Sequence, residues 1–150
     1  MRKTLFMETT KIEPGKTAGE IMELLAQANA RQIAVEYDDK RTICGMAFLI
    51  LVDGRTLPFR LPARVDPVFS IINGRRKTGR TSHTAIDREQ AVRVAWRQLL
   101  RWVQAQLAMI ETGMVTTHEV FLPYAQDRNG KTLYELLSES KFKMLEAHKD

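Results

Sequence analysis

Hydrophobic and polar residues alternate in two segments of the first half of the chain, and an apolar segment lies between them. The alternation in residues 32–38 and 55–61 predicts two half-buried strands. Residues 42–52 are apolar at almost every position, which is typical of a central strand covered on both faces. Asp53 and Gly54 form a two-residue hairpin signal between the second and third strands. The pattern predicts an antiparallel meander.

The same pattern assigns faces and an edge within this meander. In the first strand Ile33, Val35 and Tyr37 share one face, which we expect to point toward the core. Pro58 lacks an N–H group, so the third strand is expected at the edge of the sheet.

Apolar residues recur at helical spacing before and after the strands. Thr17 with Glu20, and Asp87 with Gln90, match the capping-box pattern and predict where these two helices begin. Gly113 is a typical residue for the end of the second, longer helix.

The longer helix carries two tryptophans and a row of arginines. Trp96 and Trp102 fall within its apolar arc, which favours core packing over base stacking, with Trp102 nearer the edge of the arc. Arg93, Arg97 and Arg101 follow one another at four-residue spacing on the opposite side.

Residues outside this central region predict a weak strand and a helical appendage. Residues 4–12 alternate poorly and could form a short first strand. Two further capping boxes lie near the C-terminus, Thr116 with Glu119 and Thr132 with Glu135. The last helix is expected to continue to about Ala147.

The sequence therefore predicts one α+β domain. It contains a mainly antiparallel meander of three to four strands, packed by an N-terminal helix and a long amphipathic helix, over residues 4–113. A C-terminal helical appendage follows over residues 114–147. The helix–strand–strand–strand–helix order is that of the double-stranded RNA-binding domain and also of many unrelated α+β folds.

Composition indicates a folded protein of a reducing compartment. The 150 residues are 44% hydrophobic and 27% charged, as expected for a globular domain. Cys44 is the single cysteine, so no internal disulfide can form. The apolar run of residues 43–52 is about half the length that a membrane span needs. We therefore predict a cytoplasmic protein with no membrane partner.

Positive charge is concentrated in one part of the chain. The net charge is +5, yet residues 54–86 hold seven cations against one acid, Asp66. The cations are Arg55, Arg60, Arg64, Arg75, Arg76, Lys77 and Arg80. Such a local excess favours a local anionic partner.

The densest cations predict a nucleic-acid-binding loop. Arg75, Arg76, Lys77 and Arg80 lie in residues 73–84, which read as an exposed loop, and such cations can follow a phosphate backbone. A secondary surface is predicted from Arg60, Arg64, Arg93, Arg97 and Arg101. The alternative is a solvated loop and helix face with local pairing, for example Arg93 with Glu89.

No catalytic or metal signature stands out, and no cofactor is predicted. The histidines have no partner at zinc-ligand spacing, and Cys44 reads as a core thiol. Asp38 and Lys40, with Glu36 nearby, are similar to the acid-x-lysine of metal-dependent nucleases, but they fall in a turn. A nuclease is therefore the least favoured alternative.

Several runs resemble a family of uncharacterised bacteriophage and prophage proteins. The runs are FRLP at 59–62, RVAWR at 93–97, EVFLPY at 119–124 and ETTKI at 8–12. The resemblance spans most of the chain and brings no established activity or catalytic residues with it. It implies a phage-derived protein that acts in a bacterial cytoplasm.

Two functions remain open from the sequence. The first is a non-enzymatic accessory protein that binds DNA or RNA through the basic loop. The second is a protein-interaction module, which would dock on an acidic host protein or form a homo-oligomer through the C-terminal helices.

Overall fold

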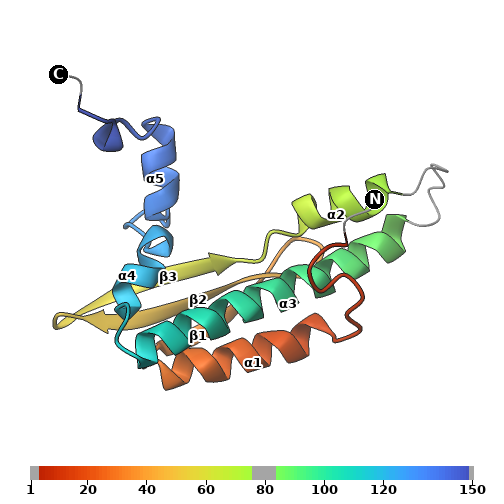
Figure 1. Cartoon of the computed structure of the whole chain (residues 1–150), viewed down its shortest axis with the longest axis horizontal. Helices are drawn as coiled ribbons and strands as arrows, with labels where there is room; N and C mark the ends of the chain where they lie inside the picture. Colours follow the sequence, from red (N-terminus) through yellow and green to blue (C-terminus); the bar gives the residue numbers. More distant parts are fainter. Residues whose placement is uncertain (1–3, 76–83, 149–150) are drawn as a thin grey trace.

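The structure is a computed structural model that describes residues 4–75 and 84–148, and it shows a three-stranded sheet with two long helices over one face (Figure 1). The elements in chain order are α1 (Pro14–Gln27), β1 (Arg31–Tyr37), β2 (Ile43–Val52), β3 (Arg55–Pro62), α2 (Val65–Gly74), α3 (Thr84–Glu111), α4 (Thr117–Phe121), η2 (Leu122–Tyr124), α5 (Leu133–Glu139) and η3 (Lys143–Leu145). The strands form an antiparallel meander in the order β1-β2-β3. The predicted α+β fold, with its N-terminal helix and long helix, is confirmed.

The hairpin between β2 and β3 fixes the register of the sheet. Asp53 and Gly54 have φ angles of 48° and 79°, the left-handed pair that a tight hairpin turn requires. Phe48 consequently pairs with Phe59 across the strands, and their buried rings stack with centroids 5.7 Å apart. The third strand lies at the edge as predicted, and the carbonyl of Pro58 on that strand accepts a hydrogen bond from the backbone N–H of Gln126 at 2.9 Å.

The second face of β2 is less covered than the sequence predicted. Helices α1 and α3 lie on the same side of the sheet (Figure 1), so these two helices do not cover the residues of β2 that point away from them. Leu51 is 57% exposed, and Ala47 and Leu49 are only half-buried. Tyr37 is also exposed, because a register shift after Glu36 removes it from the inward row.

The N-terminal segment forms turns in place of the expected short strand. Met7 has a φ of 66°, which breaks an extended conformation. The segment is instead held by side chains of α3. Gln90 donates hydrogen bonds to the carbonyls of Glu8 and Thr10 at 2.8 and 2.9 Å, and Gln98 donates to the carbonyl of Phe6 at 2.9 Å.

Both of the first two predicted helix starts were four residues too late. Helix α1 begins at Pro14, a residue that favours the first helical turn, and α3 begins at Thr84. Thr17 and Asp87 are therefore inside their helices and buried. Tertiary contacts occupy the side chains that were expected to cap these helices.

The two C-terminal capping boxes are confirmed. Thr116 with Glu119 caps α4, and Thr132 with Glu135 caps α5, with both reciprocal hydrogen bonds present in each box. The last helix is shorter than expected, because it ends at Glu139 and two positive φ angles follow, at Lys141 and Phe142. In residues 4–75 and 84–148, no helix combines the length and apolar character needed to cross a membrane.

Phe121 of α4 connects the C-terminal part of the chain to the core. Its buried ring makes edge contacts with Phe48 at 5.5 Å and with Trp102 at 5.8 Å. Trp102 is half-buried, and Trp96 is fully buried, so the expectation that both tryptophans pack in the core, with Trp102 nearer the surface, is confirmed.

We expect Phe121→Ala to reduce the free energy of unfolding by about 3–5 kcal/mol, since it removes a buried ring and leaves a cavity. Urea denaturation followed by tryptophan fluorescence would measure the change. The neighbouring Leu122 is exposed, so Leu122→Ala should change stability by no more than about 0.5 kcal/mol. Equal effects of the two substitutions would contradict the assigned packing.

Candidate nucleic-acid interface

Helices α2 and α3 pack against each other (Figure 1), and the predicted basic loop lies between them in the sequence. Helix α2 ends at Gly74 and α3 begins at Thr84. Arg76, Lys77 and Arg80 lie outside the described residues. Arg75 is described, and its guanidinium group pairs with the carboxylate of Glu8 in the N-terminal segment.

Side-chain contacts fix both ends of α2 against the first turns of α3. Near its C-terminus, the Asn73 amide donates a hydrogen bond to the Asp87 carboxylate at 3.2 Å. Near its N-terminus, Asp66 pairs with Arg88 at 2.9 Å. The Arg88 guanidinium also lies 4.2 Å from the centre of the Phe69 ring. These contacts therefore hold the end of α2 and the start of α3 together, on either side of the basic connection.

These contacts also engage three carboxylates at this end of the molecule. Glu8 is paired with Arg75, Asp66 with Arg88, and Asp87 with Asn73. One of these carboxylates, that of Glu8, opposes the positive charge that the sequence concentrates in residues 75–80.

The arginine row of α3 was predicted on the side opposite the core, but it lies largely against α1. Arg97 is only 5% exposed, and its guanidinium donates to Glu20 at 3.1 Å and to Thr17 at 3.4 Å. Arg93 pairs with Glu13 at 3.1 Å and not with Glu89. Each four-residue step turns the helix by about 40° past a full turn, so successive arginines do not share one environment.

Arg101 is the member of this row that reaches solvent. It is exposed and contacts the Gln104 amide at 2.8 Å.

Thr17 and Glu20, which the sequence assigned to a capping box, both bind Arg97. A threonine and a glutamate three residues apart fit either role, so the spacing alone held no signal for this interhelical contact.

Arg60 lies on the sheet face that the helices leave uncovered. Its guanidinium pairs with Glu36 at 2.8 Å, and the pair crosses β2 above small residues. A Cβ atom at Gly45 would lie 3.4 Å from the Glu36 carboxylate and 3.1 Å from the carbonyl of Leu61. Glycine at this position therefore avoids a tight contact with the backbone of β3.

The predicted cations thus do not converge on one surface among the described residues. Arg60 lies on the open sheet face, Arg93 and Arg97 lie along the contact between α1 and α3, and Arg75 follows α2. Arg64 is exposed at the junction between β3 and α2. Burial and ion pairing make Arg97 the candidate least able to contact a phosphate.

The acidic turn considered for a nuclease is occupied by its own backbone contacts. One oxygen of Asp38 accepts hydrogen bonds from the N–H groups of Lys40 and Thr42, both at 2.9 Å. A hollow of about 590 Å³ adjoins the turn, and its charged lining is balanced between three acids and three cations. Within the described part of the chain, no three His, Cys, Asp or Glu side chains are grouped so that they could hold a metal ion.

Comparison with known proteins gives no further assignment. No family model matches the chain, and no curated protein or solved structure matches it.

Cys44 is half-buried beside the Glu36–Arg60 pair. Burial raises the pKa of its thiol above the ordinary value of 9.0, and the negative charges of Glu36 and Asp38 raise it further. Arg60 acts in the opposite direction. The thiol is therefore mostly protonated near neutral pH and is a poor nucleophile there.

Thiol reactivity should follow this pKa. We expect the rate of Cys44 alkylation to be low at neutral pH and to rise with a midpoint above 9.0. Glu36→Gln should shift the midpoint to lower pH, because it removes a negative charge that favours the protonated thiol. The matched change Glu23→Gln on the exposed side of α1 should leave the midpoint unchanged. A midpoint below that of a free cysteine would contradict the assignment.

Replacing Arg97 should affect stability, because its guanidinium links α3 to α1. We expect Arg97→Ala to reduce the free energy of unfolding by about 2 kcal/mol through lost charge-assisted hydrogen bonds. Arg101→Ala, one turn later and exposed, should change it by no more than about 0.5 kcal/mol. Urea titrations of the two variants make the comparison, and the reverse order would show that the arginine environments are wrongly assigned.

Proposed function

We propose that this protein binds nucleic acid without catalysis, through the basic connection between α2 and α3. The observation that supports the proposal most directly is the placement of four cations in residues 75–80, between two helix ends that are anchored to each other. Phosphate contacts require cations and N–H donors and little further structure. Exposed Arg64, at the start of α2, is a suitable flanking contact.

The structure changes which arginines belong to the proposal. Arg60, Arg93 and Arg97 each pair with a carboxylate of another element, so a phosphate would have to compete with that carboxylate. The connection differs in the density of its positive charge, because the sequence places four cations within residues 75–80. We therefore assign the main contacts to Arg75, Arg76, Lys77 and Arg80.

Binding of this kind is largely independent of sequence and sensitive to salt. Each neutralised phosphate releases about one counterion, so affinity falls steeply as salt concentration rises. As part of the same proposal, we infer from the resemblance to phage proteins that this activity takes place in the cytoplasm of a bacterial host.

Fluorescence anisotropy with labelled single-stranded and duplex oligonucleotides, both DNA and RNA, tests the proposal at several salt concentrations. Arg76→Ala/Lys77→Ala/Arg80→Ala should weaken binding at least about tenfold and reduce the slope of log affinity against log salt by about 2–3. The control Lys16→Ala/Arg31→Ala/Arg128→Ala removes the same charge from exposed sites elsewhere and should retain most of the affinity.

Two results would overturn this function. One is the absence of binding to every oligonucleotide at low salt. The other is an equal loss of affinity in both triple variants, because net charge alone would then account for binding.

A second candidate function, protein interaction, is supported by a different observation. The segment after α4 carries Tyr134, Phe142, Met144 and Leu145 with much of their apolar surface exposed. Apolar groups gathered on a surface in this way mark contact sites in soluble proteins.

A further inference from the structure

The C-terminal arm, which we define as residues 133–148 with α5 and η3, buries very little of its apolar surface. Met144 is 83% exposed, Leu145 65% and Tyr134 47%. No residue of α5 is buried, and the main packing partner of α5 is the short helix η2. The arm therefore keeps an apolar surface that its own chain does not cover.

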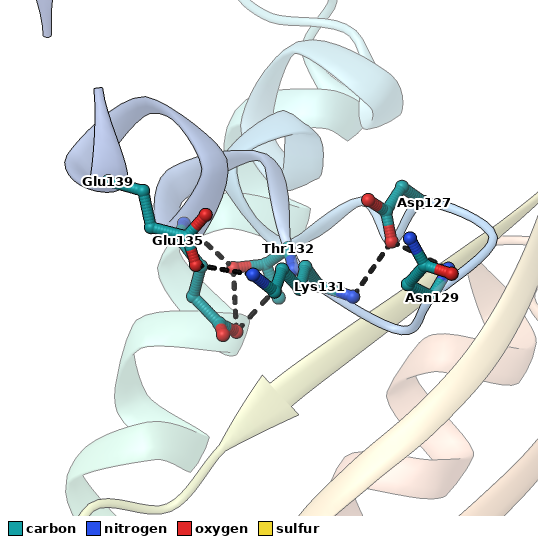
Figure 2. Close-up of polar contacts among 6 residues, drawn as sticks. All are labelled: Asp127, Asn129, Lys131, Thr132, Glu135 and Glu139. Carbon is teal, nitrogen blue, oxygen red and sulfur yellow. Dashed lines mark hydrogen bonds and ion pairs between the residues drawn. The ribbon is translucent and has the colours of Figure 1, made fainter.

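Local polar contacts, and not burial, order the base of the arm (Figure 2). One oxygen of Asp127 accepts hydrogen bonds from the N–H groups of Asn129 and Lys131 at 2.8 and 2.9 Å. Thr132 begins α5 through its capping box. The Lys131 ammonium pairs with Glu139 at 2.6 Å, and this contact raises the lysine pKa. The arm thus has a defined direction while its apolar side chains stay available.

The body of the molecule has an apolar groove next to this base. The groove encloses about 270 Å³ between β3, α2, α3 and η2, and its apolar lining includes Pro62, Val68, Ala95, Leu99, Trp102 and Tyr124. Ala95, Leu99 and Trp102 recur at helical spacing along α3 and form a surface on which another helix can pack. Arm and groove adjoin at Tyr124, the last residue of η2.

The residues that line the groove include none of the arm. Figure 1 shows that α5 projects away from the sheet and from α3. We propose that two copies of the chain form a two-fold dimer in which the arm of each copy occupies the groove of the other. This proposal does not depend on nucleic-acid binding.

Charge and symmetry favour a second copy as the occupant. The arm carries three glutamates against two lysines, whereas the groove lining contains exposed Arg64 and no carboxylate. Each chain has one arm and one groove. In a two-fold dimer the same contact therefore forms twice, and it covers both arms and both grooves. A standard interface buries about 1,600 Å², so each of the four surfaces would supply about 400 Å².

Sedimentation velocity over a range of concentrations, on protein freed of nucleic acid, tests the dimer. Met144→Glu/Leu145→Glu should raise the dimer dissociation constant at least about tenfold. The matched control Met114→Glu/Leu51→Glu changes the same residue types at exposed sites outside both surfaces and should leave the constant unchanged. A monomeric wild-type protein, or a dimer insensitive to the arm substitutions, would overturn the proposal.

Mixing two cysteine variants tests the assigned contact between chains. In a Cys44→Ser background, Met144→Cys protein should form a mixed disulfide with differently tagged Val68→Cys protein under mild oxidation. Met114→Cys in place of Met144→Cys should form this product at least about tenfold more slowly. Equal rates for the two pairs would place the arm outside the groove and overturn the proposal. Oligonucleotide binding of the same proteins is read separately, so failure of one proposal is distinguishable from failure of the other.

Discussion

Helix α3 contacts the sheet, α1, α2 and the N-terminal segment at the same time, and the rest of the structure depends on this packing. The indole N–H of Trp96 donates to the carbonyl of Ile43 at 3.1 Å, which joins the helix to the start of β2. On another side Arg97 binds Glu20 of α1. Burial separates the Trp96 indole N–H and the Arg97 guanidinium from water, so each needs a hydrogen-bond partner inside the protein. A buried polar group without a partner is energetically unfavourable. The two contacts therefore specify one orientation of α3.

Several arginines that the sequence assigned to a binding surface instead pair with carboxylates inside the fold. Arg93 and Arg97 pair with carboxylates of the α1 region, and Arg60 pairs with Glu36 across the open face of the sheet. The Nε atom of Arg97 is buried without a hydrogen-bond partner among the described residues, which is consistent with a side chain enclosed between helices. The function that we propose relies instead on cations close to the ends of α2 and α3.

Local signals in the sequence predicted those parts of the fold that local chemistry determines. The hairpin at Asp53 and Gly54 and the capping boxes at Thr116 and Thr132 each satisfy their hydrogen bonds or φ angles within a few residues. Thr17 shows the limit of this reasoning, because its partner Arg97 is 80 positions away in the sequence.

The candidate site was predictable in composition but not in arrangement. The excess of cations in residues 54–86 is visible in the sequence, whereas the carboxylate that faces each arginine depends on the packing of distant elements. Glu8 beside Arg75 is such a case. The exposed apolar arm was also hidden, because its leucines and aromatic residues have the same pattern as a helix that packs on a core.

The most direct test of binding at residues 75–80 is NMR of isotope-labelled protein during titration with an oligonucleotide at low salt. The spectra follow the side-chain N–H signals of the arginines. We predict that the signals of Arg75, Arg76 and Arg80 shift, while that of Arg97, held by Glu20, does not. A shift of the Arg97 signal as large as theirs, or binding that leaves the signals of residues 75–80 unchanged, would contradict the proposed binding site.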